Sequence, residues 1–172
     1  TWVVYNDGPL NVSANTTING YTAGAANYIT LTVAGASQVA SGASQRHTGI
    51  AGTGAVVEVT AAVNENVLTV AVPYTRVEWL ELDGNDFIVW AGVQVEATGS
   101  NALLRHLLIH DVETTGSQGD GFGMAVDGDG TVVRNCIVYE YGEDGIYVTA
   151  NGVLVQNTTL HRSTNTSNVG EA

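Results

Sequence analysis

The sequence has no lysine, and its 172 residues include only five arginines against 17 acidic side chains. The formal net charge is therefore −12. Proteins that bind nucleic acids use clustered lysine and arginine to displace counterions from the phosphates. Anionic lipid surfaces attract the same residues. The composition excludes a nucleic-acid partner and argues against an anionic membrane as one.

The sequence also has only one cysteine and no long apolar run, which excludes a disulfide framework and argues against a transmembrane helix. The single cysteine, Cys136, permits neither an internal disulfide nor a cysteine-rich metal site. It stands between Asn135 and Ile137, and we expect it to be a small buried apolar side chain. No run of 18 apolar residues occurs, so no membrane insertion is expected. No segment keeps a 3.6-residue period, which leaves little room for α-helices.

What the sequence does contain favours one β-rich domain. Hydrophobic residues make up 44% of the chain, enough for a sizeable core, and 172 residues suit a single domain. Charged residues reach only 13%, and 21 glycines accompany abundant valine, threonine and asparagine. This composition favours strands joined by tight turns.

The start of the chain and its sequons bear on location. The chain begins at Thr1 with neither Met nor a secretion signal, so we expect either a removed upstream segment or a piece of a longer protein. Asn-x-Ser/Thr sequons, which permit glycosylation in a suitable secretory pathway, begin at Asn11, Asn15, Asn157 and Asn165. An acidic, lysine-free surface rich in threonine favours an extracellular, cell-surface or virion location.

Internal repeats are the strongest signal in the sequence. Four segments that begin 27, 29 and 22 positions apart align without gaps: Val77–Asp83, Leu104–His110, Val133–Tyr139 and Val155–His161. A shorter element recurs between them, at Gly92–Glu96, Gly123–Asp127 and Gly145–Thr149. A minimum period of 22 residues, lengthened by loops at a fixed place, predicts the stacked coils of a solenoid.

Stacking places matched residues about 4.8 Å apart along the solenoid. One interior column is predicted to contain Leu82, Ile109, Val138 and Leu160. A second wall is predicted to contain Val95, Val126 and Val148. We expect the aligned glycines, Gly92, Gly123 and Gly145, to permit a corner before each second strand.

These repeats resemble the right-handed parallel β-helix of the pectin-lyase-like family, including β-helix repeat proteins of phages and environmental bacteria. The resemblance covers residues 74–168 and lies in the period and in the shape apolar-x-Asn-x-x-apolar, at Val133–Val138 and Val155–Leu160. It implies an all-β fold with an inward asparagine ladder at one turn. Asn135 and Asn157 match that ladder, whereas Trp79 and His106 depart from it. Because this architecture hosts lyases, hydrolases, adhesins and tail spikes, the resemblance says little about chemistry.

Two parts of the chain are expected. Residues 74–172 form the regular β-helix coils, and residues 1–73 form less regular, β-rich coils and loops continuous with them. Within the first part, strands are predicted at Thr1–Tyr5, Tyr28–Val33, Ala55–Val59 and Val67–Val72. The stretch Ala34–Gly54 is predicted to be a long loop.

Acidic residues are the candidates for catalysis and for metal binding. Glu96 and Asp127 fall in one column on adjacent coils, so their carboxylates could approach to about 5 Å, a separation that suits glycoside hydrolysis, with Asp129 beside them. The alternative is that these acids only end strands beside glycine. Asp120, Asp127 and Asp129 could also bind Ca²⁺, which prefers oxygen ligands, and no other cofactor is expected.

Two further columns could contact a glycan. Arg105 and Arg134 stack and could hold an acidic sugar, or they could simply be neutralised by Glu78 on an exposed sheet face. The second column contains His110, Tyr139 and His161. Its side chains could face a sugar, although aromatic residues there are equally expected as packing residues.

The leading hypothesis is a non-enzymatic building block of an extracellular filament, surface appendage or virion, which self-associates as a homo-oligomer or polymer. A solenoid has open strand edges at its ends, and the polar residues after Arg162 offer no cap. We expect the strand of Trp2, Val3, Val4 and Tyr5 either to add to a neighbour's sheet edge or to pair within its own coil. The alternative function is a carbohydrate-active enzyme or sugar-binding module that uses the exposed sheet face.

Overall fold

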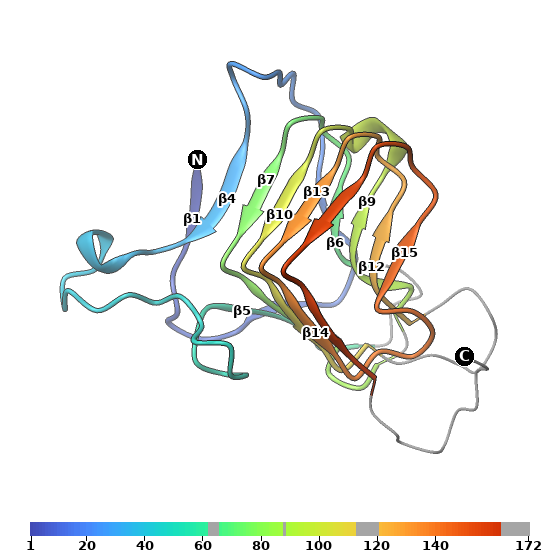
Figure 1. Cartoon of the computed structure of the whole chain (residues 1–172). Coiled ribbons are helices and arrows are strands. Elements are labelled where there is room, and N and C mark those ends of the chain that lie inside the picture. Colours follow the sequence, from blue (N-terminus) through green and yellow to red (C-terminus); the bar gives the residue numbers. More distant parts are fainter. Residues whose placement is uncertain (62–65, 88, 113–120, 163–172) are drawn as a thin grey trace.

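The chain folds into a parallel β-helix solenoid of three sheets (Figure 1). The computed structural model describes residues 1–61, 66–87, 89–112 and 121–162. Every pairing between its strands is parallel, and the part of the chain described contains two short 3₁₀ turns, Ala36–Gln38 and Ala97–Gly99, but no α-helix. The all-β prediction is therefore confirmed. With the later coils nearer the viewer in Figure 1, the chain passes down the first sheet, across the second and up the third, which is the right-handed sense.

Each sheet takes one strand from every coil, so strands far apart in the sequence are neighbours. Sheet A contains β1 (Trp2–Val4), β4 (Thr30–Val33), β7 (Arg76–Glu78), β10 (Leu103–Arg105), β13 (Val132–Arg134) and β16 (Leu154–Gln156). Sheet B contains β2 (Leu10–Val12), β5 (Val56–Val59), β8 (Glu81–Asp83), β11 (Leu108–His110), β14 (Ile137–Tyr139) and β17 (Thr159–His161). Sheet C contains β3 (Thr16–Ile18), β6 (Asn66–Val70), β9 (Ala91–Val95), β12 (Phe122–Val126) and β15 (Ile146–Val148).

The predicted columns are confirmed residue by residue. In sheet B, Ile109 pairs with Leu82 on one side and with Val138 on the other, and Val138 pairs with Leu160. In sheet C, Val126 lies between Val95 and Val148 in the same way. Leu82, Ile109, Val138, Val95 and Val126 are fully buried and belong to one core, because each coil buries the apolar face of its neighbour.

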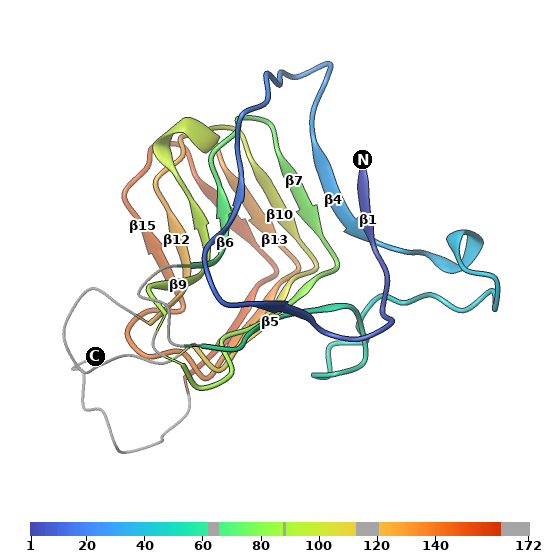
Figure 2. The same cartoon turned by 180° about the vertical axis from the view of Figure 1, so that it is seen from behind.

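Residues 1–73 contribute β1 to β6, the first two coils of the same three sheets. Strands overlap all four segments expected there, and β6 begins one residue before the expected segment, at Asn66. The sequence did not indicate β2 or β3, each of which is three residues long. The segment 34–55 between β4 and β5 is the expected long connection. Figure 2 shows the first coil, in blue, facing the viewer at one end of the solenoid.

The turn from sheet A to sheet B is left-handed in four successive coils. Trp79, His106, Asn135 and Asn157 have φ of 66, 53, 55 and 48°. Asparagine tolerates this conformation better than most residues, which explains its recurrence. The side chains of Asn135 and Asn157 are exposed, however, so the ladder implied by the resemblance lies on the surface and not inside.

Two of the aligned glycines, Gly92 and Gly123, serve a different purpose from the expected corner, whereas Gly145 lies in a bend directly before β15. Gly92 and Gly123 lie within strands β9 and β12 and have no unusual φ. A Cβ on Gly92 would lie 2.5 Å from Cγ2 of Ile109, and one on Gly123 would lie 2.3 Å from Cγ1 of Val138. Glycine is needed here because the sheet B core column occupies the space of a side chain.

None of the helical turns in the residues described is long or apolar enough to span a bilayer.

Candidate functional site

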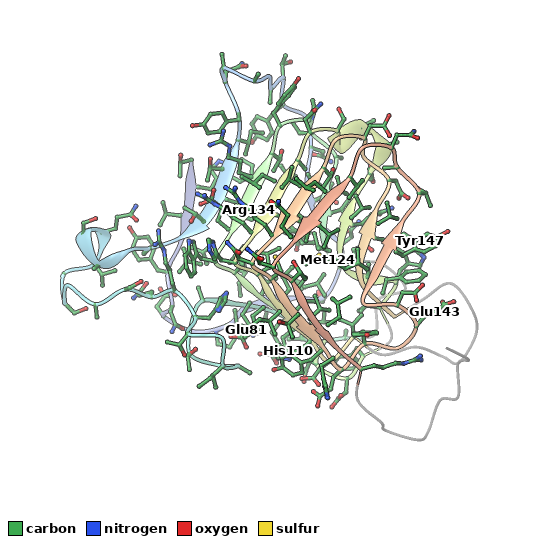
Figure 3. All side chains as sticks on the ribbon, viewed as in Figure 1. Glu81, His110, Met124, Arg134, Glu143 and Tyr147 are labelled. Atoms are coloured by element: carbon green, nitrogen blue, oxygen red, sulfur yellow. The ribbon has the colours of Figure 1, made fainter. Side chains whose placement is uncertain are left out.

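The densest group of ionisable side chains lies on the outer face of sheet B, around His110. This imidazole is only 3% exposed and stacks on the ring of Tyr139, with the ring centroids 5.0 Å apart. His110 pairs in register with Asp83 of the preceding coil. Figure 3 shows His110 and Glu81 close together on this face of the molecule. We call Glu81, Asp83, His110, Asp111 and Glu140 the sheet B ion cluster.

Both ring nitrogens of His110 are bound to carboxylates. Nδ1 lies 2.7 Å from Oδ2 of Asp111, and Nε2 lies 3.0 Å from Oε1 of Glu81. Oδ1 of Asp83 is 3.6 Å from Nδ1. Burial alone would lower the pKa of His110, but the hydrogen bonds to Asp111 and Glu81 and the charge of Asp83 raise it to about 10. His110 is therefore a buried imidazolium at neutral pH, and both its nitrogens donate.

Asp111 and Glu140 form a hydrogen-bonded pair of acids at the end of this column. Both have left-handed backbones, with φ of 53 and 52°, directly after β11 and β14. The hydrogen bond to Asp111, together with burial and the Asp111 charge, raises the pKa of Glu140 to about 7. The hydrogen bond from His110 lowers the pKa of Asp111. The pair consequently shares one proton below neutral pH, with Glu140 as its carrier.

Glu81 connects the ion cluster to the segment 34–55. Its carboxylate is buried and accepts the Gly52 N–H at both oxygens, at 2.9 and 3.0 Å. The same segment lies against the next coils. Nε2 of His47 is 2.6 Å from the carbonyl oxygen of His106, and a Cβ on Gly49 would lie 3.3 Å from Ile137. The ion cluster thus holds a long connection onto sheet B.

The geometry of the ion cluster suits electrostatic support better than catalysis or metal binding. Oxygen and nitrogen donors of Asp83, His110 and Asp111 lie within 4.8 Å of one another. A cation could bind them only by displacing the proton that His110 holds between two carboxylates. A substrate would have no access to the buried imidazole. His110, one of the residues expected to face a sugar, is buried with both ring nitrogens hydrogen-bonded, while Tyr139 is half-buried and His161 is exposed.

The candidate acids on sheet C belong to a polar ladder along its outer face. Asp127 accepts hydrogen bonds from Nε2 of Gln94 at 3.1 Å and from the Thr149 hydroxyl. Glu96 accepts instead from the Thr98 hydroxyl at 3.4 Å. Farther along this face Asn66 donates to Thr69 and Gln94. The carboxylates of Glu96 and Asp127 therefore engage different neighbours.

Of the two remaining candidate acids, Asp129 lies in a turn and Asp120 lies outside the described residues. Asp129 accepts the backbone N–H of Asn151 at 2.8 Å and so fixes the turn that leads into the next coil. Asp120, the third candidate calcium ligand, lies outside the described residues.

The arginines of sheet A stack as expected, with Arg105 in register with Glu78 and Arg134. Nη2 of Arg105 is 2.8 Å from Oε1 of Glu78, which neutralises it. Arg134 instead lines a surface hollow of about 270 Å³, whose other lining residues are Ala25, Tyr28, Tyr74, Arg76, Asn101, Ala102, Leu103 and Val132. Arg76 crosses this hollow with Cζ 3.3 Å from the Tyr28 ring centroid. None of the described residues that line it is a carboxylate.

The two ends of the stack expose residues of the interior columns. In the terminal strands, five apolar side chains of the interior columns are 40 to 50% exposed: Trp2, Leu10, Val148, Val155 and Leu160. β1 pairs with β4 of its own chain, and β16 likewise pairs only with β13 among the strands described. Tyr5 lies beyond β1 and is exposed. The residues after Arg162, expected to offer no cap, lie outside the described residues.

Sequence reasoning missed several of these residues. Asp111, Glu140 and Gly84 occupy the position just after the seven-residue repeat, so extending the alignment by one residue would have found the acid pair. Leu10 gave no signal, because β2 lies among turn residues. Glu81 was visible in the repeat, but nothing in the sequence indicated its bond to Gly52.

The three parallel sheets define a parallel β-helix solenoid, and among the described residues both of its ends expose apolar side chains of the interior columns. Comparison with known proteins finds no matching family model, no matching curated protein and no matching solved structure.

Proposed function

We propose that this chain is a non-enzymatic building block of an extracellular filament, surface appendage or virion, in which copies join end to end through their terminal coils. Affiliation with the pectin-lyase-like β-helices is part of the proposal. It is supported by the minimum period of 22 residues and by asparagine at the left-handed turn in Asn135 and Asn157.

The distribution of charge along the strands carries this proposal. In the described strands, every Asp, Glu and Arg lies in an internal strand: Glu58, Arg76, Glu78, Glu81, Asp83, Arg105 and Arg134. The six terminal strands, β1, β2 and β3 at one end and β15, β16 and β17 at the other, contain none. Soluble proteins usually protect open strand edges with charge or proline. Edges without such protection, in a chain of net charge −12, are suited to pairing.

The exposed apolar residues at each end support the same conclusion. Interface cores are depleted in charge and rich in apolar and aromatic side chains. Trp2 and Leu10 supply these at one end, and Val155 and Leu160 at the other. Because the two ends differ, the contact is heterologous, and it produces a ring if the rotation closes and a filament if it does not.

Light scattering and electron microscopy of the purified chain test the proposal. We expect oligomers that grow with protein concentration, and more of them when salt is raised from about 20 mM to about 300 mM, because screening weakens repulsion between the acidic copies. Leu160→Asp should give monomers. Ile50→Asp, on the exposed 34–55 segment, is the matched control and should assemble like the parent. A parent that stays monomeric in every condition, or a Leu160→Asp variant that assembles normally, contradicts the proposal.

Glycan binding is the second candidate function, and the hollow on sheet A favours it. Tyr28 and Tyr74 offer aromatic rings, and Arg134 offers hydrogen-bond donors, without a carboxylate in the lining. Calorimetric titration with neutral and uronate-containing oligosaccharides tests it. Binding that Arg134→Gln weakens supports a sugar site, and the absence of binding to every oligosaccharide opposes it.

A further inference from the structure

We infer that, at the junction, β16 of one copy pairs with β1 of the next and β17 pairs with β2, in the register that continues the interior columns of sheets A and B. This inference rests on the proposed end-to-end assembly and specifies its partner surface as the opposite end of a second copy. It places Val155 beside Trp2 and Leu160 beside Leu10 of the second copy.

Sheet A determines the first of these pairs. Trp2 pairs with Leu31, Leu31 with Val77, and Val77 with Leu104. Leu104 pairs in turn with Val133, and Val133 with Val155. Trp2 and Val155 are thus the two ends of one interior column. Among the described residues, neither has a strand partner on its outer side, and each is partly exposed.

Sheet B supplies a second column with the same property. Leu10 pairs with Val57, and Val57 with Leu82, the first residue of the column that ends at Leu160. At the junction, Leu160 would meet Leu10, two leucines that are 46 and 50% exposed. Covering both removes the largest apolar side chains of this column from water.

Among the described residues, sheet C contains five strands where sheets A and B contain six, and the two ends of its interior column are unequal. Ile18 pairs with Val70, which pairs with Val95 and so leads to Val148. Ile18 is already buried within its own copy, whereas Val148 is exposed. With β16 beside β1 and β17 beside β2, one strand layer of about 4.8 Å separates β15 from β3 of the next copy, so no pairing is inferred in sheet C.

The alternation of side chains fixes the register. Shifting one strand by a single residue exchanges its inner and outer faces. Such a shift would bring Gln156 or His161 into the interior column and leave Val155 or Leu160 in water. In the proposed register Gln156 lies beside Val3, and His161 lies beside Asn11, all on the outer faces. Val3, Asn11 and Gln156 are uncharged, so neither pair brings two like charges together.

Mixed single-cysteine variants test this register directly. Matched residues on neighbouring parallel strands lie about 4.8 Å apart, within the range that a disulfide spans. Val3→Cys mixed with Gln156→Cys, and Asn11→Cys mixed with His161→Cys, are the in-register pairs. Val3→Cys mixed with Leu154→Cys is the matched control, since Leu154 shares the outer face but lies about 6.6 Å farther along the strand. The native Cys136 is buried, with a pKa raised by burial to about 11, so the parent should not crosslink.

In a glutathione redox buffer, we expect both in-register mixtures to form disulfide-linked dimers at least about tenfold faster than the offset mixture, as seen on non-reducing gels, because the offset pair exceeds disulfide reach. Oligomers in light scattering combined with equal crosslinking of in-register and offset pairs would overturn the register alone. Efficient crosslinking of Val3→Cys with itself would indicate a head-to-head contact and also overturn it. Monomers throughout would overturn the proposed assembly as well.

Discussion

His110 carries its charge where the fold would otherwise exclude one. A buried charge is tolerated only when its partners replace the lost water, and Asp111, Glu81 and Asp83 do so here. The same contacts leave the imidazole no free nitrogen for a ligand. At the scale of single residues, the ion cluster therefore stabilises the fold and couples that stability to pH.

Stability is expected to fall as the pH rises from about 7 to about 10.5. The pKa of His110 rises on folding from 6.5 to about 10, so its contribution is complete below 6.5 and is lost as the pH passes through about 10. His110→Gln should lower the free energy of unfolding at pH 6 by about 3 kcal/mol, because Glu81 loses its charged partner. Urea unfolding at pH 6, 8 and 10 measures both effects. A variant with the same pH profile as the parent would contradict this role.

Glu140→Gln should stabilise the protein above pH 7 and matter little at pH 5. The folded pKa of Glu140, about 7, lies above its ordinary value of 4.5, so the shared proton stabilises fully below 4.5 and is lost as the pH rises through 7. Glutamine keeps a donor to Asp111 without needing that proton. Thermal melts at pH 5 and pH 8 test this. Glu96→Gln is the control, because Glu96 is hydrogen-bonded to the Thr98 hydroxyl and not to another carboxylate. This variant should shift the melting temperature equally at both pH values.

At the scale of elements, the sequence predicted the columns well and the turns poorly. Leu82, Ile109 and Val138 repeat because each must fill the same interior position, and gapless alignment detects that constraint. The positions of β2 and β3 depend on pairing with β5 and β6 from the next coil, which three-residue segments do not encode locally. The purpose of Gly123 also escaped prediction, because it depends on how closely Val138 approaches from another sheet.

Gly123→Ala should destabilise the fold by about 2 to 4 kcal/mol, because its Cβ would fall 2.3 Å from Cγ1 of Val138 and 2.6 Å from the backbone oxygen of Gly145. The added methyl group would be held between the Gly145 backbone and the buried Val138 side chain, neither of which can move away easily. Gly35→Ala is the control, since its nearest neighbour would be 3.7 Å away. Equal melting temperatures for the two variants would show that the strands tolerate the extra methyl group.

Glu81→Ala should release the segment 34–55 while the coils persist. The Gly52 N–H would lose both carboxylate oxygens, and a buried donor without a partner favours local opening. Limited proteolysis should then cleave within residues 34–55 at least several-fold faster than in the parent, with an unchanged far-UV spectrum. Glu96→Gln serves again as the control and should leave the cleavage rate unaltered. Parent-like cleavage of Glu81→Ala would assign the anchoring to other contacts.

At the scale of the whole molecule, the fold followed from the sequence, but the candidate interface did not. The period revealed stacked coils, and stacked coils require two ends. Which residues the ends expose depends on the register of all six strands in a sheet. Only the structure therefore shows that Trp2 and Val155 are the two ends of one column. The chemistry of a solenoid is likewise set by its outer residues and loops, which the repeat leaves free to vary.

The melting temperature should rise with protein concentration, because association that buries the terminal columns stabilises the folded state by mass action. A comparison at about 1 μM and about 100 μM by differential scanning fluorimetry measures this dependence. Leu160→Asp should melt at a temperature independent of concentration. If the melting temperature of the parent does not depend on protein concentration, its terminal coils do not associate.

The segment 34–55 has a consequence for cooperativity. In a solenoid each repeat contacts only its neighbours, so coils tend to fray one at a time from the ends. Here a segment that leaves the second coil touches Glu81 of the third, His106 of the fourth and Ile137 of the fifth. The segment 34–55 thus connects coils that are not nearest neighbours. When any one of these coils unfolds, the segment is released and its contacts with the other coils are also broken. The middle of the stack should therefore unfold as one unit, and a filament built from it would yield under load at its junctions before its coils unwind.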